Sequence, residues 1–458
     1  MAVSLFRKIL VANRGEIAVR IIQACQELGI KTVAIYSEAD ADSLHVRMAD
    51  ESHCVGPAAP TRSYLNVEAI MDIATRSQVE AIHPGYGFLA ENAYFASVCN
   101  TWGIDFIGPS PESIEQMGGK VQARERMMQA GVPVIPGSQG ALSSLEEAES
   151  MAEKIGYPVL IKASAGGGGR GIRVVQEPSE LRDAFETASR EAQAAFGDGS
   201  LFMEKYLRNP RHVEFQVMAD RHGNFVHLWE RDSSIQRRRQ KLLEEAPCPI
   251  LSPELRERMS EAAILAARAV HYVNAGTVEF LLDEDGQFYF IEMNTRIQVE
   301  HPTTEWITQI DLIKEQILVA AGEPLSFTQE DIKPRGWSIE FRINAEDPYN
   351  RFMPSPGTIT RFDTPGGPGI RIDTGFQAGS TVQPFYDSLV AKLIVWGRNR
   401  QEALQRGRQA IRNFRIEGIH TTLPLHQDLL NHPRFQQGDY NTLFLEEEFL
   451  ARRANSRS

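Results

Sequence analysis

Cysteine is scarce in this chain. The four that occur, Cys25, Cys54, Cys99 and Cys248, are far apart and form no C-x-x-C pair. A disulfide framework and a zinc site are therefore not expected, and we interpret the four as buried apolar residues rather than as nucleophiles. Such sparse cysteine is typical of a reducing compartment, so we expect a cytoplasmic protein.

The chain also has fewer positive than negative charges, and it has no long apolar run. The chain has 48 Lys and Arg against 60 Asp and Glu, a net charge of −12. Nucleic-acid surfaces need a net basic face, so we expect no nucleic-acid partner. No run reaches the roughly 18 apolar residues of a membrane span, so we expect no membrane partner, and no signal peptide is apparent. No G-x-G-x-x-G follows the first predicted strand, so dinucleotide binding has no support.

The residues that are present indicate a multidomain globular protein. Its 458 residues are 42% hydrophobic and 24% charged, which is enough for several packed cores. Residues 9–12, 32–36 and 104–107 are apolar runs typical of buried strands. Between the first two runs apolar residues recur at helical spacing, and Gly29 ends the predicted helix. This alternation predicts a parallel, doubly wound sheet. Antiparallel strands with helices are expected over 213–321, and a mixed α/β domain from about 333 onward.

A glycine-rich loop follows the predicted strand VLIKA. Its four successive glycines are Gly166, Gly167, Gly168 and Gly169. They favour a mobile lid whose backbone N–H groups close over phosphates, although a plain flexible surface loop has the same composition. Lys162, at the end of the strand, favours the first interpretation because its charge would offset that of a phosphate. The loop is not a Walker A motif, since no G-K-[ST] ends it.

A predicted hairpin over 277–301 carries two glutamates. Asp285-Gly286 is a preferred two-residue turn, and the register that it sets places Glu279 directly opposite Glu292. Two carboxylates about 5 Å apart repel by roughly 3 kcal/mol at an effective dielectric of 20. A hard divalent cation, Mg²⁺ or Mn²⁺, would remove that repulsion. The alternative is a solvated pair on an exposed face, and a one-residue change of register would remove the argument.

Period-2 alternation is expected to continue beyond the hairpin. It places Asn294, Arg296, Gln298 and Glu300 on the face of Glu292, with apolar neighbours on the other face. Arg296 suits a planar oxyanion, and Glu300 beside it suits a general base. Upstream, the run QRRRQK contains Arg239 and Lys241, which are candidate anion contacts. A basic run is more often a solvated face.

Eight strings of this sequence resemble biotin carboxylases. They are ANRGEIAVRI, AIHPGYGFLAEN, GGGGRG, MEKYL, HVEFQV, FIEMNTRIQVEHPTTE, RINAEDP and FYDSL, and they extend from residue 12 to 389. The resemblance implies a mixed α/β and α+β fold. It comprises a Rossmann-like N-terminal domain (1–118), an ATP-grasp domain (119–330) with a mobile lid (about 133–207), a C-terminal mixed α/β domain (333–448) and a tail (449–458).

The resemblance also implies roles for individual residues. The ATP-binding residues would be Lys120, Lys162, Gly166, Gly167, Gly168, Gly169, Glu204, Lys205, Leu207, His212, Gln236 and Arg239. The metal ligands would be Glu279, Glu292 and Asn294, and the bicarbonate pocket would be Lys241, Arg296, Gln298, Val299 and Glu300. Glu300 would deprotonate bicarbonate, and Arg342 would bind biotin and stabilise its enolate. Lys241 and Arg296 would also serve in catalysis.

The implied reaction is the carboxylation of biotin through carboxyphosphate. ATP with two Mg²⁺ or Mn²⁺ ions would phosphorylate bicarbonate, and biotin would arrive attached to a carrier protein. No Met-Lys-Met attachment site occurs here, so the implied partners are a biotin carboxyl carrier protein, carboxyltransferase subunits and a second copy of this chain. Acetyl-CoA carboxylase, hence fatty acid biosynthesis, is the default, but the acceptor could equally be propionyl-CoA, pyruvate or another.

Three positions depart from the family's pattern. Arg239 stands where histidine is common, Gly119 where the family has MGDK, and Ala165 replaces one glycine of the loop. They put ATP affinity and lid closure in doubt, but none removes a group that the chemistry requires. Two other hypotheses remain: another ATP-grasp ligase that joins a carboxylate to an amine, and a silent regulatory subunit that binds ATP.

Overall fold

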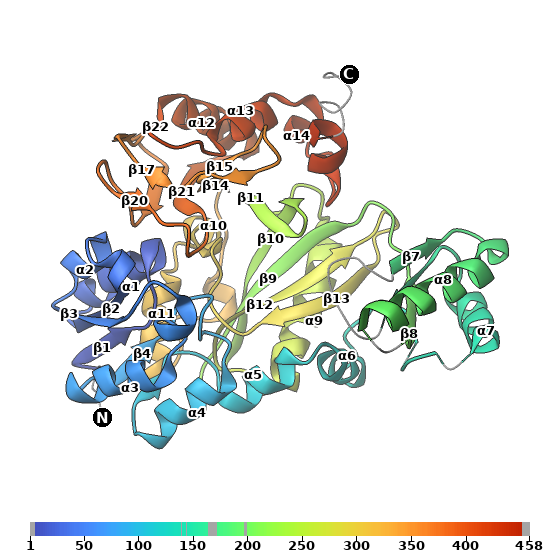
Figure 1. Cartoon of the computed structure of the whole chain (residues 1–458), viewed down its shortest axis with the longest axis horizontal. Coiled ribbons are helices and arrows are strands. Elements are labelled where there is room, and N and C mark those ends of the chain that lie inside the picture. The colour runs from blue at the N-terminus through green and yellow to red at the C-terminus, as the bar shows by residue number, and fades with distance from the viewer. Residues whose placement is uncertain (1–4, 139, 143, 164–171, 197–198, 451–458) are drawn as a thin grey trace. The chain divides into compact units, whose positions relative to one another are not determined.

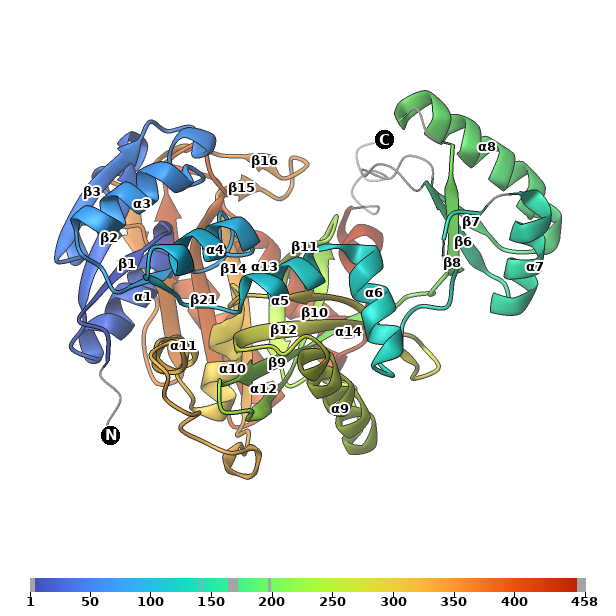
Figure 2. The same ribbon diagram turned by 90° about the horizontal axis from the view of Figure 1, so that it is seen from below.

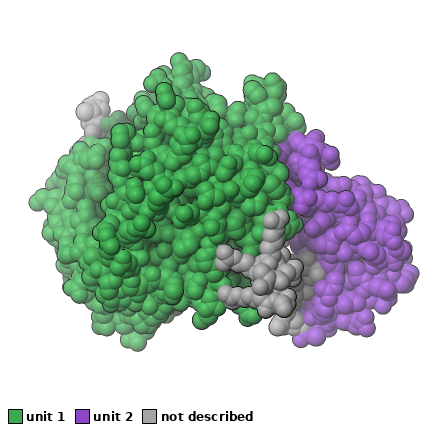
Figure 3. All heavy atoms as spheres, turned by 90° about the horizontal axis from the view of Figure 1, so that it is seen from above, with its two compact units in different colours: residues 1–132, 211–280, 292–458 green, residues 133–210, 281–291 purple. Residues whose placement is uncertain are grey.

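The computed structural model describes residues 5–138, 140–142, 144–163, 172–196 and 199–450. The chain divides into two compact units, drawn in green and purple in Figure 3. The larger unit comprises residues 1–132, 211–280 and 292–458, and the smaller comprises 133–210 and 281–291. In the described part of the chain, no helix is long and apolar enough to cross a membrane.

The N-terminal part of the larger unit is a parallel sheet, blue in Figure 1. In spatial order, its strands are β3 (Glu51–Gly56), β2 (Lys31–Ser37), β1 (Lys8–Val11), β4 (Ala81–His83) and β5 (Asp105–Phe106). The helices of this part are α1 (Gly15–Glu27), η1 (Glu38–Asp40), α2 (Leu44–Met48), η2 (Pro60–Arg62), α3 (Val67–Arg76), α4 (Ala93–Thr101), α5 (Pro111–Gly118) and α6 (Lys120–Gln129). Ile9, Leu10 and Val11 are fully buried, because a central parallel strand is covered on both faces. The predicted parallel sheet is confirmed.

The functional part of the molecule is built on an eight-stranded sheet. In spatial order, its strands are β13 (Phe288–Asn294), β12 (Asn274–Leu282), β9 (Arg211–Ala219), β10 (Phe225–Arg237), β11 (Gln240–Ala246), β14 (Trp337–Asn344), β21 (Leu389–Gly397) and β19 (Ile370–Thr374). The last three come from the C-terminal third of the chain, so sequence-distant segments share one sheet. Short helix α10 (His301–Thr308) contacts β10, β11, β14 and β21, whereas α12 (Arg400–Asn413) contacts β14 and β21.

Smaller elements complete the larger unit. The helices are α9 (Pro253–Ala269), α11 (Leu312–Ala320), η3 (Gln329–Asp331), α13 (Leu423–Asn431), α14 (Pro433–Gln437) and η4 (Glu446–Leu450). Three two-stranded sheets pair β15 (Glu346–Asp347) with β16 (Met353–Pro354), β17 (Gly357–Thr358) with β20 (Thr381–Val382), and β18 (Arg361–Asp363) with β22 (Arg415–Glu417). Of the predicted tail, residues 451–458 lie outside the described part.

The smaller unit is a three-stranded antiparallel sheet with two helices. Its strands are β7 (Ile172–Val175), β6 (Val159–Ala163) and β8 (Leu201–Lys205), in that spatial order. Helices α7 (Leu145–Ile155) and α8 (Pro178–Phe196) lie on the same side of this sheet in Figure 2. Val159, Ile161 and Met203 form the core beneath them. The predicted glycine loop, Gly166 to Gly169, lies outside the described residues.

The turn of the predicted hairpin is one residue longer than expected. The N–H of Asp283 donates to the carbonyl of Gln287 at 2.9 Å, so three residues form the loop. Gly286 has φ +74°, which fits a type I turn closed by a glycine bulge rather than the predicted two-residue turn. The register predicted from that turn was therefore wrong beside the loop. The prediction that Glu279 lies directly opposite Glu292 depended on that register and is no longer supported.

The strand after the turn is also shorter than expected. β13 ends at Asn294, and residues 295–300 are irregular up to the start of α10. The predicted alternation to Glu300 as one continuous strand was wrong. The segment instead leaves the strand and places Glu300 at the N-terminal end of the helix.

A β-bulge in β11 decides which side chains share a face. Ile235 pairs with Leu243, but Gln236 pairs with Lys241, so Leu242 is the extra residue. Leu242 and Leu243 both enter the apolar core that also contains Ile235. As a result, Lys241 and Glu244, three residues apart, point to the opposite, charged face of the sheet.

Candidate functional site

Three buried glutamates converge on one lysine. Lys241 Nζ donates to Glu214 Oε2 at 2.5 Å, to Glu279 Oε1 at 2.8 Å and to Glu300 Oε1 at 2.8 Å. The three carboxylates come from β9, from β12 and from the residue before α10. Without the ammonium group their mutual repulsion in a site of low dielectric would be severe, so Lys241 holds the cluster together.

A fully buried arginine supports this cluster from one side. Arg231, on β10, is 0% exposed and its guanidinium donates to Glu214 Oε1 at 2.6 Å. Its remaining hydrogen bonds go to neutral side-chain oxygens, those of Gln216, Thr304, Thr277 and Gln298. These contacts tie several elements to one planar cation, which restricts where the carboxylates can lie.

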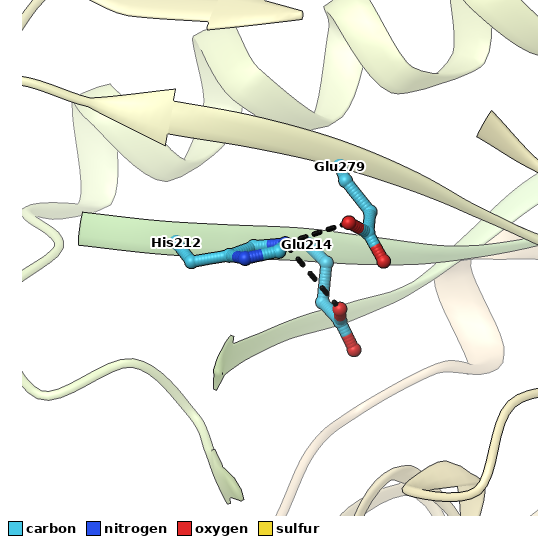
Figure 4. Close-up of side chains that lie close together, drawn as sticks. All are labelled: His212, Glu214 and Glu279. Atoms are coloured by element: carbon cyan, nitrogen blue, oxygen red, sulfur yellow. Dashed lines mark ion pairs between the residues drawn. The ribbon is translucent and has the colours of Figure 1, made fainter. Parts of the chain in front are cut away.

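His212 lies at the edge of the cluster. Its Nε2 is 2.8 Å from Glu279 Oε2 and 4.0 Å from Glu214 Oε2. Both ion pairs are marked by dashed lines in Figure 4. Burial lowers the pKa of His212, but Glu279 and Glu214 outweigh it and the net direction is upward. Ligand atoms of these three residues lie within 4.8 Å of one another, close enough to hold a metal ion.

The segment after β13 brings its predicted polar side chains to the same place. Asn294 Nδ2 donates to Glu279 Oε1 at 2.8 Å, and Gln298 Nε2 donates to the same oxygen at 2.9 Å. Arg296 donates through Nη2 to Asn294 Oδ1 at 2.9 Å and through Nε to Glu91 at 2.9 Å. The irregular backbone thus retains the convergence that a continuous strand was expected to provide.

Arg342, on β14, connects this cluster to the C-terminal strands. Its Nη2 is 2.9 Å from Glu300 Oε2 and 2.5 Å from Glu244 Oε1. Lys392 on β21 is 0% exposed and donates from Nζ to the carbonyl of Val299 at 2.9 Å. Its ammonium is also 3.0 Å from Glu16 Oε2. The backbone next to Glu300 is therefore anchored by a buried cation.

The charge balance keeps Glu300 and Glu279 ionised. Burial alone would raise the pKa of Glu300, but Lys241, Arg342 and Arg231 hold it well below its ordinary value. Burial opposes ionisation of Glu279 as well, and Lys241 with His212 holds its pKa well below the ordinary value. Glu214 differs, because burial and the two neighbouring carboxylates raise its pKa despite Lys241 and Arg231.

A cavity of about 270 Å³ lies in the larger unit, beside the Glu16 and Lys392 pair. Glu16, Tyr86, Tyr386 and Asp387 are among the residues that line it. The Tyr86 hydroxyl donates to Glu16, and Arg342 contributes to the electrostatic surroundings of Tyr86. A small ligand in this cavity would therefore lie close to Glu16, whose partner Lys392 donates to the Val299 carbonyl.

The predicted nucleotide residues are distributed between the two units. Lys162, on β6, forms an ion pair with Glu204 on β8, and Lys205 and Leu207 follow Glu204 in the smaller unit. In the larger unit, Gln236 is the strand partner of Lys241, and Arg239 is in the turn after it with φ +69°.

Two further predicted residues belong to the larger unit. Lys120 is the first residue of α6, after Gly119, which caps the helix. Glu292 is a half-buried residue of β13.

Sequence reasoning missed several residues of the cluster. Glu214 was detectable, because alternation in HVEFQV places it on the face of His212 and Gln216. Arg231 and Lys392 lie in strands that read as ordinary, and only tertiary contacts show that they enter the cluster. Glu244 follows a bulge that no local signal marks.

Three family models match consecutive parts of the chain. "Biotin carboxylase, N-terminal domain" matches residues 5–114, "Carbamoyl-phosphate synthase L chain, ATP binding domain" matches 119–328, and "Biotin carboxylase C-terminal domain" matches 340–447. The predicted resemblance and the implied three-domain fold are confirmed.

Individual proteins match over nearly the whole chain. The chain is 57% identical to Biotin carboxylase 1 of Bacillus subtilis, with 96% of this chain and 98% of that protein covered. It is 55% identical to a pyruvate carboxylase subunit of Methanothermobacter thermautotrophicus, with 97% and 90% covered. A solved dimer of the 2-oxoglutarate carboxylase biotin carboxylase domain of Hydrogenobacter thermophilus, in complex with MgADP, ADP and bicarbonate, is 54% identical, with a TM-score of 0.87 over 97% of this chain and 98% of that one.

Proposed function

The chain belongs to the biotin carboxylase family of ATP-dependent ligases, and from this membership we propose that it carboxylates carrier-bound biotin as the first half-reaction of acetyl-CoA carboxylase. The observation that carries the proposal is the placement of Glu300. This residue is only 2% exposed, yet Lys241 and Arg342 each donate to one of its carboxylate oxygens. A carboxylate kept ionised there is in the form that accepts a proton, and the fixed cations beside it attract an anionic substrate.

Bicarbonate is proposed to bind between Glu300 and Arg296. Arg296 offers a planar guanidinium, Lys241 an ammonium, Gln298 an amide and Val299 its backbone. In this arrangement the cations attract the anion and Glu300 accepts its proton. The oxyanion is then free to attack the γ-phosphate of ATP. Bicarbonate in the complex with the 2-oxoglutarate carboxylase relative supports this substrate.

The metal proposed for ATP is Mg²⁺, which is present with ADP in that relative. The donors Glu279, Glu292 and Asn294 fit it, because carboxylate and amide oxygens are the ligands that this hard cation prefers. When bound, the ion would neutralise charge on the phosphates. Mn²⁺ as an alternative and a second ion are further parts of the proposal.

The nucleotide is proposed to contact the residues that the family resemblance implies. Lys120 and Lys162 would bind phosphates, and Glu204, Lys205 and Leu207 would bind adenine, with His212, Gln236 and Arg239 also on the nucleotide. Lys162 supports the first role, because its partly exposed ammonium already pairs with an anionic group, the Glu204 carboxylate. The lid role of Gly166 to Gly169 remains a proposal from sequence.

Biotin is proposed to meet Arg342. Its guanidinium lies beside Glu300, so an oxygen that gains negative charge there would be stabilised next to the bicarbonate site. After carboxyphosphate gives CO₂ and phosphate, the phosphate would take the ureido proton. The biotin nitrogen would then attack CO₂. Arg342 in this scheme stabilises the enolate and transfers no proton.

Acetyl-CoA is the proposed final acceptor, and other acceptors are the alternatives. Relatives at similar identity are named for pyruvate and 2-oxoglutarate carboxylases as well as simply biotin carboxylase. Pyruvate, propionyl-CoA or another acceptor would leave the site described here unchanged, because a separate carboxyltransferase selects the acceptor. A carrier protein and a carboxyltransferase are the proposed partners. The dimer of the relative supports a homodimer.

ADP release tests the proposed function. The purified chain is given MgATP and bicarbonate, with and without free biotin. We expect release that requires bicarbonate and is strongly stimulated by biotin. ATP binding with no response to either addition would contradict the proposal and would favour another ATP-grasp ligase or a silent regulatory protein. Addition of candidate carrier proteins together with their carboxyltransferases then identifies the acceptor.

A further inference from the structure

Two fully buried glutamates face each other behind Arg342. Glu244 on β11 and Glu340 on β14 are direct partners in the antiparallel register, and both are 0% exposed. Directly opposed residues have Cβ atoms about 4.5–5.5 Å apart. Neither residue belongs to the ATP, metal or bicarbonate sites proposed above.

The face on which they lie carries charges from several elements. Arg342 is two residues beyond Glu340 on the same strand face, and Lys392 is its register partner on β21. Asp373 on β19 is in turn the partner of Lys392. The charged groups that face the glutamate pair are Lys241 from β11, Arg231 from β10, Arg342 from β14, Lys392 from β21 and Glu300 from the start of α10.

The two glutamates differ in their partners. Glu244 Oε1 lies 2.5 Å from Arg342 Nη2. No oxygen of either carboxylate has a hydrogen bond of normal geometry among the described residues, so this ion pair with Arg342 is what distinguishes Glu244 from Glu340. A buried carboxylate without donors strongly favours its neutral form, and two opposed carboxylates cannot both ionise at ordinary cost. The pair is therefore expected to hold one proton, with the remaining charge next to Arg342.

We propose that Glu244 is a positioning residue for Arg342, and that Glu340 keeps the proton that allows Glu244 to remain charged. This inference rests on the proposed function, because the contact between Arg342 and biotin belongs to that proposal. Arg342 then has two fixed anions: Glu300, which acts on bicarbonate, and Glu244, which does no chemistry. Glu244 holds the guanidinium in place while Glu300 gains and loses a proton.

The titration of the pair gives the expected pH dependence. Burial raises the pKa of Glu244 to about 7, with Glu300 adding to the rise and Arg342 and Lys241 opposing it. Burial raises the pKa of Glu340 well above its ordinary value, with Lys392 opposing. Above about pH 7 the pair has one proton and Glu244 is charged. Below about pH 7 the pair binds a second proton, and the ion pair between Glu244 and Arg342 weakens.

Paired glutamine variants test the inference. Glu244→Gln should lower biotin-stimulated ADP release at pH 8 by about tenfold or more, since the buried ion pair with Arg342 is lost. It should leave slow, biotin-independent ADP release with bicarbonate within about twofold. Glu340→Gln should stay within about threefold in both assays, because glutamine imitates the protonated acid. Biotin-stimulated ADP release by the parent should decrease as the pH falls below about 7, whereas Glu244→Gln should show no such decrease.

Glu245→Gln is the matched control. Glu245 is the next residue of β11 and equally buried, but it faces the other side of the sheet and pairs with Arg400 at 2.7 Å. It reports the cost of breaking a buried ion pair away from Arg342. Three results would overturn the positioning role. They are equal losses in Glu244→Gln and Glu245→Gln, equal losses of Glu244→Gln in the two assays, and equal losses in Glu244→Gln and Glu340→Gln. A parent without any response to biotin would instead overturn the proposed function.

Discussion

At the scale of single residues, the site is a set of buried charges that require one another. Glu279 illustrates this, because one of its oxygens accepts from Lys241, Asn294 and Gln298 together. A cation arriving at Glu279 would compete with donors already in place. Metal affinity should therefore depend strongly on the negative charge of its ligands.

Neutralising the proposed metal ligands tests that dependence. Glu279→Gln and Glu292→Gln should each sharply reduce turnover, by about 100-fold at low Mg²⁺, because a carboxylate ligand becomes a neutral amide. Raising the Mg²⁺ concentration should restore part of the activity. ADP release measured across a Mg²⁺ series checks this, and near-normal turnover of both variants at low Mg²⁺ would contradict the ligand set.

Arg231 gives a prediction about stability. Arg231→Met should lower the free energy of unfolding by about 3–5 kcal/mol, because Glu214 would lose a fully buried partner. Urea unfolding measures the change. Arg7→Met is the control, since the Arg7 and Glu80 pair is largely exposed and should contribute below about 1 kcal/mol. Similar changes in both variants would contradict the distinction.

At the scale of elements, the strands were predictable, but their details were not. The parallel strands and the hairpin follow from apolar runs and turn residues. The extra residue in the turn after Asp283, the bulge at Leu242 and the end of β13 at Asn294 depend on packing, which local pattern does not contain. Even so, Arg296, Gln298 and Glu300 were correctly expected to converge with Asn294. Their side chains reach the cluster from an irregular segment.

The anchoring of that irregular segment can be tested through Lys392. Lys392→Met removes the donor to the Val299 carbonyl and leaves Glu16 without its cation, whereas Asp373 keeps Arg371. We expect KM for bicarbonate to rise about tenfold, with a smaller change in KM for ATP, because the carbonyl next to Glu300 loses its support. Lys392→Arg should restore part of the effect. An equal rise in both KM values would indicate general disruption instead.

At the scale of the whole molecule, buried neutral histidines make the fold sensitive to acid. Burial lowers the pKa of His83 and His301 to about 3, and that of His45 and His426 to about 4. In the unfolded chain they bind protons below about pH 6.5. Their contribution to stability is thus complete above pH 6.5 and is lost as the pH falls toward the folded values. Glu244 and Glu340, whose pKa values are raised, oppose this trend.

A single histidine variant isolates the effect. Between pH 6 and 4, the unfolding free energy of the parent should fall more steeply than that of His83→Gln, by up to about 1.4 kcal/mol per pH unit, the value for one proton. Urea unfolding at several pH values provides the slopes. Adding His45→Gln should reduce the slope again. Identical slopes in parent and variants would show that His83 is protonated in the folded state.

The order of strands in the large sheet has a consequence for how the chain is made. β11 ends at Ala246, but its neighbour β14 begins only at Trp337, and β21 at Leu389. On the ribosome, the strand that carries Lys241 and Glu244 must therefore wait until β14 has been synthesised before its edge is covered. Until then the glutamates and lysines of the uncovered strand stay hydrated. Charge at an open edge discourages pairing with a neighbouring nascent chain. The same charges that form the site would then protect the growing polypeptide from aggregation.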